Sequence, residues 1–379
     1  MSGASSPRYL WAYSAADDWT LAWHQRLLQR RRERGYDVEG FCVTPPSLKR
    51  RWLPFQELDR RWRYGDRALL AMYEELAEKL SGRDVLILYN GANLHPEFVS
   101  RLDLVKVYTA GDDPESTEIL TRPLAPAFDI HLVNNIDCLD MYRSWGLTHV
   151  HFWPLGSLAT VDEVADIDEE GILDLSTRPV PIVFLGGYQQ HRKDRFDRII
   201  AEFPQAFCAG SGWPRGFLPW EEMWRTYRQS QIGWNFHNST GPINFRTYEL
   251  PAYGVMQVCD NKANLGKIFE LGKEVVGFDS IDECIELTRY YLAHPEEQRR
   301  IAAAGWRRWR DDYHPDRVWE KLDDIVTAYL AGQAGPVEQG SAAVLGLLEQ
   351  RRRATAIKRF AAVPARYVEK YLTRPRRKG

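Results

Sequence analysis

The chain of 379 residues lacks any uninterrupted apolar run of about 18 residues, the length that a membrane-spanning helix needs. Its first residues, MSGASSPRYLWAY, also lack the cationic segment and following apolar stretch that are typical of a secretory signal. Both absences argue against a secreted or membrane-spanning protein. We therefore expect the protein to remain in the cytoplasm.

Cysteine is scarce, and its spacing does not suit a metal cluster or a disulfide framework. The five cysteines are Cys42, Cys138, Cys208, Cys259 and Cys284, and no two of them have the spacing of zinc ligands. An odd number of distant thiols in a long chain is typical of reduced, mostly buried cysteines. We therefore expect free thiols and no structural zinc site.

A broad positively charged face is also lacking, because the basic residues gather in the tail. The formal net charge is −2, yet residues 343–379 hold eleven Lys or Arg against two Glu, a net of +9 that leaves −11 on the remainder. An acidic body argues against duplex nucleic-acid binding over a wide surface. We expect the basic tail to dock on the acidic body; the alternative is a peripheral membrane or nucleic-acid contact.

Short apolar runs alternate with amphipathic stretches along most of the chain, which is 44% hydrophobic and 27% charged, an ordinary composition for a globular protein. The apolar runs predict strands at residues 8–13, 38–43, 84–90, 105–109, 129–134, 149–153, 182–185, 206–209, 232–236 and 255–259. The amphipathic stretches predict helices at residues 21–34, 66–80, 136–145, 193–203, 220–230, 264–271, 281–293, 295–311 and 315–331, and no element in residues 44–65.

Strands that alternate with helices predict parallel sheets, so we expect an α/β protein with two Rossmann-like doubly wound domains facing a cleft. Residues 154–181 are acidic and bracketed by prolines, which is typical of a linker. The predicted domains are residues 1–155 and 156–335, followed by a basic helical tail, 336–379. Ligands of such sheets bind at the carboxyl ends of the strands, so the loops after the strands hold the candidate residues.

The stretch QIGWNFHNSTGPINFRTYELPAYGVMQVCD, residues 231–260, is the richest of these loops. Its predicted strand delivers Asn235, His237 and Asn238 to a loop with Gly and Pro. Asn244 or Thr247 then caps a short helix that ends at Gly254.

That short helix carries Arg246 and Glu249, three positions apart near its start. A cation and a carboxylate in this place suit an anionic ligand that also bears sugar hydroxyls, as a sugar nucleotide does.

A second candidate is the turn after residues 182–185. Gly186 and Gly187 permit the backbone to approach a diphosphate closely, and Arg192 and Lys193 follow to neutralise it near a helix start. An ordinary turn followed by a solvated basic helix explains the same residues equally well.

The motifs FLGGYQQHR, NFH, RTYELPAYGVMQVCDN and the helical run from EVVGFDS to VWEKL follow one another within residues 183–322. In this order they resemble the C-terminal domain of GT-B glycosyltransferases, in the branch related to the protein CgeB and to the group 1 enzymes. The resemblance implies a nucleotide-sugar donor site in the second domain and an acceptor site in the first. It implies that Asn235 and Thr247 contact the donor, that Arg246 binds its phosphates and that Glu249 binds its ribose hydroxyls.

One position departs from that pattern. Retaining group 1 enzymes carry a second glutamate eight positions before the one that matches Glu249, and Gly241 stands there in this chain. The stereochemical outcome therefore stays open, with His237 or Asn238 as the replacement contact to the donor sugar. A buried core histidine is the alternative explanation of His237.

An inverting mechanism needs a general base in the first domain. The candidates after the first predicted strand are Asp17, Asp18 and His24, and those after the fourth are Asp112 and Asp113. Paired aspartates are also common in turns and helix caps, which is the alternative explanation. Asp112 and Asp113 could bind a metal, but the resemblance implies that basic groups and helix dipoles stabilise the leaving diphosphate. We therefore expect no metal and no cofactor, with a UDP-sugar as co-substrate.

The predicted function is transfer of a hexosyl or pentosyl group from a nucleoside-diphosphate sugar to a hydroxyl of a small molecule, a glycan or a modified nucleobase in DNA. Two alternatives stay open. One is a nucleotide-sugar epimerase of the same build, and the other is a binding protein without catalytic activity, which the missing glutamate at Gly241 favours.

Overall fold

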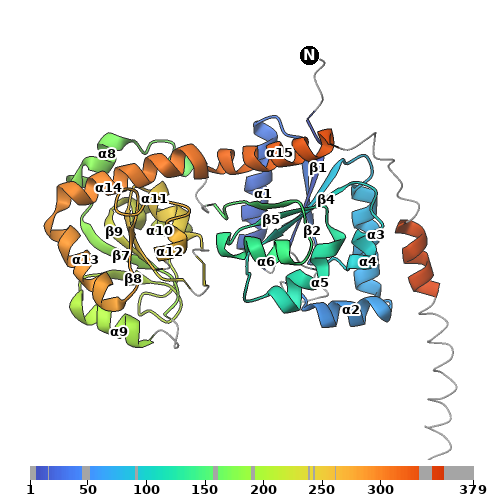
Figure 1. Cartoon of the computed structure of the whole chain (residues 1–379), viewed down its shortest axis with the longest axis horizontal. Coiled ribbons are helices and arrows are strands. Elements are labelled where there is room, and N and C mark those ends of the chain that lie inside the picture. The colour runs from blue at the N-terminus through green and yellow to red at the C-terminus, as the bar shows by residue number, and fades with distance from the viewer. Residues whose placement is uncertain are drawn as a thin grey trace, which may run out of the picture. The chain divides into compact units, whose positions relative to one another are not determined.

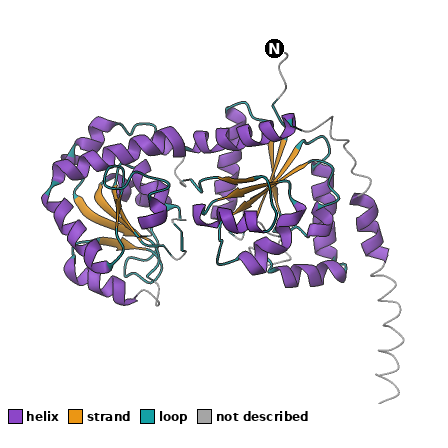
Figure 2. Cartoon of the chain, viewed as in Figure 1, coloured by secondary structure: helices purple, strands orange, loops and turns teal. Residues whose placement is uncertain are grey.

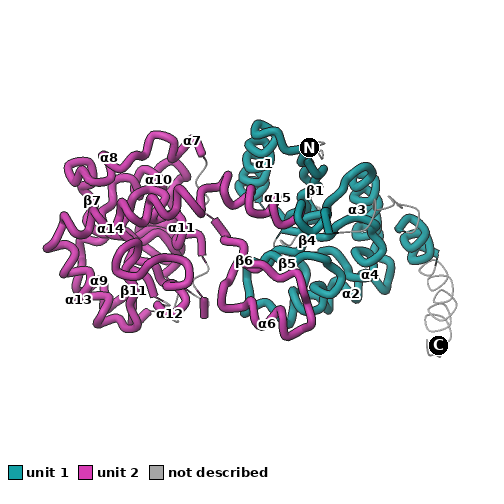
Figure 3. Tube along the Cα trace, turned by 45° about the horizontal axis from the view of Figure 1, so that its top comes forward, with its two compact units in different colours: residues 1–132, 327–379 teal, residues 133–326 magenta. Residues whose placement is uncertain are grey.

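The computed structural model describes residues 6–15, 17–44, 52–89, 93–156, 161–188, 193–237, 240–241, 244–260, 262–332 and 344–353. Internal contacts divide the chain into two compact units, Met1–Leu132 with Thr327–Gly379, and Val133–Val326 (Figure 3). The sequence placed its boundary near residue 155, between the last strand of the first sheet and the first strand of the second.

The first sheet, of which Figure 1 labels β1, β2, β4 and β5, has six strands in the order β2-β1-β3-β4-β5-β6. They are β1 (Tyr9–Tyr13), β2 (Val38–Cys42), β3 (Val85–Leu88), β4 (Val105–Ala110), β5 (Ile130–Val133) and β6 (Val150–Phe152). β1 runs parallel to both neighbours, with Tyr9 opposite Val38 on one side and Val85 on the other. Every residue of β1 and β3 is buried, as expected for a parallel sheet covered on both faces.

The helices that accompany this sheet are α1 (Asp18–Glu33), α2 (Phe55–Arg63), α3 (Arg67–Lys79), α4 (Pro96–Val99), α5 (Arg122–Leu124) and α6 (Leu139–Ser144). Helix α2 is a correction, because the sequence predicted no element in residues 44–65. Its buried residues are Leu58 and Trp62, one turn apart among arginines, so the apolar stripe is too narrow to dominate the local composition.

The second sheet has five strands in the order β11-β10-β9-β7-β8. They are β7 (Val180–Leu185), β8 (Phe207–Ala209), β9 (Ser230–Asn235), β10 (Met256–Cys259) and β11 (Val276–Gly277). In both sheets the first strand lies between the second and the third, so the strand order reverses between β1 and β3 and between β7 and β9. These reversals are the places where open α/β sheets bind ligands. The short β11 was not predicted.

The helices that follow the first sheet are α7 (Val161–Val164), α8 (Glu169–Leu173), α9 (Lys193–Glu202), α10 (Trp220–Arg228), α11 (Arg246–Ala252), α12 (Lys262–Leu265), α13 (Ile281–Ala293), α14 (Pro295–Arg308) and α15 (Pro315–Ala331). Helix α12 is shorter than the predicted 264–271. In each unit the strands lie between helices (Figure 2), so the predicted α/β class with doubly wound sheets is confirmed. No described helix is long and apolar enough to cross a membrane.

A helix over residues 344–353 belongs to the first unit. Its Val344 and Leu348 are each 1% exposed. Arg351 pairs with Glu97 and lies over the Trp62 ring, 5.1 Å from its centroid. The expected docking of the tail is confirmed for this part of it, and residues 354–379 lie outside the described range.

Two buried arginines hold the amino edge of the second sheet together. Arg299 donates to the carbonyls of Gln231, Gly254 and Ile172, and Arg178 donates to those of Ser230 and Tyr253. These carbonyls lie at the starts of β9 and β10 and at the end of α8. Burial lowers the pKa of Arg299, but a ring of carbonyl acceptors stabilises its charge.

We expect Arg299→Met to lower the free energy of unfolding by about 2 to 4 kcal/mol, because it leaves buried carbonyls without their donor. Urea unfolding followed by circular dichroism measures this. Arg289→Met is the matched control, since Arg289 pairs with Glu202 with its side chain 56% exposed, and we expect little change there. Equal stability of Arg299→Met and the wild type would contradict the structural role.

Candidate functional site

The carboxyl ends of β7 and β9 meet at the guanidinium group of Arg246. Its Nη1 donates to the carbonyl of Leu185 at 3.0 Å, and its Nη2 donates to that of Phe236 at 2.9 Å. The group also lies over the Phe184 ring, 5.0 Å from the centroid. Arg246 therefore joins the two strands at the point where the strand order reverses, and places a positive charge there.

Gly186, the residue after β7, packs directly against this guanidinium. A Cβ on Gly186 would lie 2.5 Å from Arg246 Nη1 and 3.1 Å from Phe184 Cζ, so a larger residue here would require the guanidinium group to move. The turn is held from its other side, where Gly186 N–H donates to Ala209 O at 2.9 Å and Trp213 Nε1 donates to Gly186 O at 2.9 Å. In the structure the close neighbour of Gly186 is Arg246, whereas the sequence predicted an approach of this turn to a diphosphate, which stays a prediction.

A network of buried amides and hydroxyls extends from Arg246 along the strand ends. Asn235 is fully buried; its Oδ1 accepts from Arg246 Nε at 3.3 Å and from Asn244 Nδ2 at 2.8 Å. Its Nδ2 donates to Gln257 Oε1 at 2.7 Å and to Thr247 Oγ1 at 3.1 Å. The N-cap residue of α11 is Phe245, not the predicted Asn244 or Thr247, but Asn244 Oδ1 accepts from Thr247 N–H in the first turn at 2.9 Å.

His237 continues the network on the far side of Thr247. Its Nε2 lies 2.9 Å from Thr247 Oγ1 and its Nδ1 lies 2.6 Å from Asp260 Oδ1. His237, Cys259 and Asp260 offer donor atoms within 4.8 Å of one another, a set that could coordinate a metal ion. The direct hydrogen bond between the His237 imidazole and the Asp260 carboxylate explains why these two side chains lie close together without a metal ion. Burial raises the pKa of the Cys259 thiol, which disfavours the thiolate form that binds metals.

Glu249 lies one turn further along α11 and is 4% exposed. Burial, and then the nearby Glu249 carboxylate, raises the pKa of the Tyr227 phenol far above its ordinary value. Glu249 also lies close enough to Tyr253 to act on its pKa in the same direction. Its place beside Arg246, on the same short helix, brings the two residues predicted for phosphate and ribose into one region.

The remaining residues that the sequence predicted to contact the donor are Gly187, Lys193, Arg192 and Asn238, and none of them takes part in this network among the residues that the structure describes. Lys193, the first residue of α9, pairs with Asp197, and Tyr188 donates to the same carboxylate. Gly187 is described and follows Gly186 in the turn. Arg192 and Asn238 lie outside the described residues.

In the first unit, Asp113 is held inside the fold rather than at a surface. It is 1% exposed, and its Oδ1 accepts from the hydroxyls of Ser116, Thr117 and Thr121 at 3.3, 3.0 and 2.9 Å. Asp112 and Asp18 are exposed, the latter as the first residue of α1. This geometry favours a structural role for Asp113, while Asp18 and Asp112 keep their carboxylates accessible.

The strand-order reversal between β1 and β3 carries an aromatic cluster. His24 is 2% exposed, and its ring stacks on Tyr13 at 4.0 Å and meets Tyr89 edge-on at 5.3 Å. Trp11 Nε1 donates to His24 Nδ1 at 3.3 Å. An indole N–H only donates, so the neutral ring keeps its proton on Nε2 and Nδ1 is engaged. His24 is thereby disfavoured as the general base.

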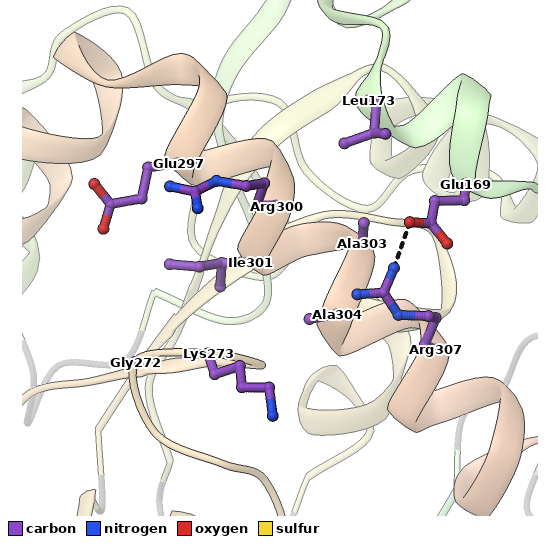
Figure 4. A pocket seen from close by; sticks show the side chains of 10 residues that line it. All are labelled: Glu169, Leu173, Gly272, Lys273, Glu297, Arg300, Ile301, Ala303, Ala304 and Arg307. Carbon is purple, nitrogen blue, oxygen red and sulfur yellow. Dashed lines mark hydrogen bonds and ion pairs between the residues drawn. The ribbon is translucent and has the colours of Figure 1, made fainter.

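A pocket of about 350 Å³ lies elsewhere on the second unit, between α8, α14 and the loop before β11 (Figure 4). Its walls include Leu173, Lys273 and Arg300, and Arg307 pairs with Glu169 at its rim. Because the loop before a strand lies at the amino edge of a parallel sheet, this pocket is at the edge opposite to Arg246. Ligands of such sheets bind at the carboxyl edge, so the network is the better candidate site.

Residues 192–324 match the model of a family described as glycosyl transferase-like. The matched range contains Arg246 and the network of amides and hydroxyls that extends from it, while Leu185 and Gly186 lie just before that range. The chain has the GT-B fold. A glycosyltransferase from Rickettsia africae superposes with a TM-score of 0.60 at 10% identity, covering 87% of this chain and 100% of that one.

Two further GT-B structures are similar. Sucrose-phosphate synthase from Thermosynechococcus elongatus gives a TM-score of 0.59 at 11% identity, covering 86% of this chain and 100% of that one. HepE from Anabaena, in complex with UDP and glucose, gives 0.56 at 11% identity, covering 85% and 100%. No curated protein matches the sequence.

The sequence did not single out Asp260 or Gln257, although both belong to the network. Asp260 directly follows a predicted strand, so the rule that selected His237 also pointed to it. Gln257 lies within a strand and carried no such signal, since its partners, Asn235 and Thr247, come from other elements.

We expect Gly186→Ala to lower the free energy of unfolding by about 1 to 3 kcal/mol, because the added Cβ displaces the Arg246 guanidinium. Thermal unfolding measures this. Gly346→Ala is the matched control, because a Cβ there meets nothing within 4 Å. An unchanged melting temperature for Gly186→Ala would contradict the close packing.

We expect Asp113→Ala to lower the free energy of unfolding by about 2 to 4 kcal/mol, because three buried hydroxyls lose their common acceptor. Urea unfolding of this variant and of the exposed neighbour, Asp112→Ala, gives the comparison. Wild-type stability of Asp113→Ala would remove the structural explanation and leave the catalytic prediction in its place.

Proposed function

We propose that the protein is a glycosyltransferase that moves a sugar from a nucleoside-diphosphate donor to an acceptor hydroxyl. The observation that carries this proposal is the cationic, polar network at the strand-order reversal of the second sheet, inside the range that matches the glycosyl transferase-like family. The GT-B fold supports the same class of reaction.

Arg246 is the proposed partner of the donor diphosphate. Its guanidinium stands at the carboxyl edge of the sheet, next to the Gly186–Gly187 turn, and glycines at such a turn let the backbone amides approach a phosphate. Glu249 is the proposed partner of the ribose hydroxyls, because a carboxylate accepts from two vicinal hydroxyls. Arg192, Lys193 and Asn238 complete the proposed donor contacts.

A UDP-sugar is the proposed donor. HepE from Anabaena was solved with UDP and glucose, and that likeness of fold supports testing uridine donors first. The proposed acceptor is a hydroxyl group, in a small molecule, a glycan or a modified nucleobase. An exposed carboxylate of the first unit, Asp18 or Asp112, is the proposed general base if the reaction inverts the anomeric centre.

Donor binding is tested by thermal shift and calorimetry against UDP, GDP, dTDP and CMP sugars. We expect a UDP-sugar to stabilise the protein in proportion to its affinity, because a ligand that binds only the folded state raises the melting temperature. Stabilisation by none of these compounds would count against the whole proposal. Release of UDP with a glycosylated product separates a transferase from a binding protein, and release of an epimerised sugar would favour the epimerase.

Arg246→Ala should weaken donor binding by the equivalent of about 2 to 4 kcal/mol, because it removes the proposed half-buried cationic partner of the phosphates. Calorimetric titration with the donor found above measures the change. Arg289→Ala on α13, which pairs with Glu202 at the surface, is the control. Undiminished affinity of a folded Arg246→Ala would confine Arg246 to its structural contacts with Leu185 and Phe236.

The reaction is proposed to need no metal ion, because Arg246 and the backbone amides of the turn supply positive charge for the leaving diphosphate. Activity should survive treatment with EDTA followed by gel filtration. Loss of activity that Mg²⁺, Mn²⁺ or Zn²⁺ restores would overturn this point.

A further inference from the structure

Asp260 follows directly after β10 and begins a chain of hydrogen bonds that leads into the candidate site. Its two carboxylate oxygens lie 3.0 and 3.2 Å from the backbone nitrogen of His237, and one of them lies 2.6 Å from His237 Nδ1. A carboxylate only accepts hydrogen bonds, so the shared proton belongs to Nδ1. Asp260 thus fixes both the backbone after β9 and the orientation of the imidazole.

The imidazole of His237 in turn contacts the hydroxyl group of Thr247. His237 Nε2 lies 2.9 Å from Thr247 Oγ1, and the imidazole side chain is fully buried. Both ring nitrogens are therefore engaged within the second unit. A histidine held in this way is poorly placed to exchange a proton with a substrate, and acts instead on the residue beside it.

Thr247 is the neighbour of Arg246 in the first turn of α11. Its hydroxyl accepts from Asn235 Nδ2 at 3.1 Å, and Asn235 Oδ1 in turn accepts from Arg246 Nε at 3.3 Å. Two routes, the helical backbone and Asn235, therefore connect Thr247 to the guanidinium group. Satisfied buried networks of this kind rigidify the groups that they connect.

We propose that Asp260 is a positioning residue of the donor site, acting through His237 and Thr247 to fix the first turn of α11 and the aim of Arg246. This inference rests on the proposed donor-binding function. It assigns His237 to the support of the site, and it assigns a role to a carboxylate that does not itself contact the guanidinium.

A double-mutant cycle on the full chain tests whether Asp260 acts through His237. We expect Asp260→Ala and His237→Ala each to weaken UDP binding at least tenfold in calorimetry. The double variant should bind UDP no more than about threefold more weakly than the single variant with the lower UDP affinity, because the second substitution breaks no further hydrogen bond to Thr247. Losses that multiply would overturn the proposal. Asp279→Ala is the control, since that side chain is 73% exposed.

A conservative series at Thr247 separates positioning from general stability. Thr247→Val keeps the shape and removes the hydroxyl, so UDP affinity should fall at least fivefold. Thr247→Ser restores the hydroxyl and should return the affinity to within about twofold of the wild type. Equal losses in Val and Ser variants would contradict the hydrogen-bonded route. Asp260→Asn retains an oxygen acceptor, and is the substitute if Asp260→Ala does not fold.

Two measurements do not depend on any ligand. A low-field imidazole proton resonance assigned to His237 Nδ1–H should be present in the wild type and lost in Asp260→Ala. Hydrogen exchange at the amides of Thr247 and Tyr248 should be at least tenfold faster in that variant than in Asp279→Ala.

These two measurements distinguish the possible failures. If the wild type does not bind UDP but both effects are present, the donor proposal fails and the support of α11 by Asp260 stands. If the resonance is absent and the exchange is unchanged, the positioning role is overturned. One equivalent of tightly bound zinc in the purified protein, lost in Cys259→Ser, would also overturn it in favour of a metal site.

Discussion

The contact between the Arg246 guanidinium and the ends of β7 and β9 is the interaction on which the rest of the second unit's site depends. It joins two carbonyls across the strand-order reversal and lies over Phe184. A side chain at Gly186 would have to displace it, and its Nε donates to Asn235 Oδ1. A single charged group thereby determines which residues the surrounding turn and helix tolerate.

At both edges of the second sheet an arginine guanidinium group donates hydrogen bonds to backbone carbonyls, but the surroundings of the arginines differ. At the amino edge, Arg299 and Arg178 donate to carbonyls within a buried setting, which stabilises the fold. At the carboxyl edge, Arg246 does the same but adjoins a glycine turn and a network of amides and hydroxyls. This second arrangement places a positive charge beside a turn that begins with two glycines, which is why we propose it as the site of the donor diphosphate.

The strand-order reversals of the two sheets differ in character. The one in the first unit is aromatic, with His24 stacked on Tyr13 and its Nδ1 engaged by Trp11. The one in the second unit is polar and cationic. This difference fits the proposed division between an acceptor side and a donor side. In both places a histidine that the sequence offered for catalysis, His24 or His237, is a buried, hydrogen-bonded group.

The sequence by itself determined the α/β class, the parallel strands and the stretch that holds the candidate site, because apolar runs, helical periodicity and turn residues are local signals. It also pointed to Asn244, whose side chain accepts from the first turn of α11, although Phe245 is the N-cap residue. Helix α2, the helices α4, α5, α7 and α8 of three to five residues, and the two-residue β11 were not predicted, and α7 and α8 lie where the sequence predicted a linker. A narrow apolar stripe among arginines and very short elements carry little local signal. The partners of Arg246 and the link from Asp260 to Thr247 were decided only by the tertiary structure. They join residues of separate strands and helices, and hydrogen-bond geometry between such residues exists only after the sheet has assembled.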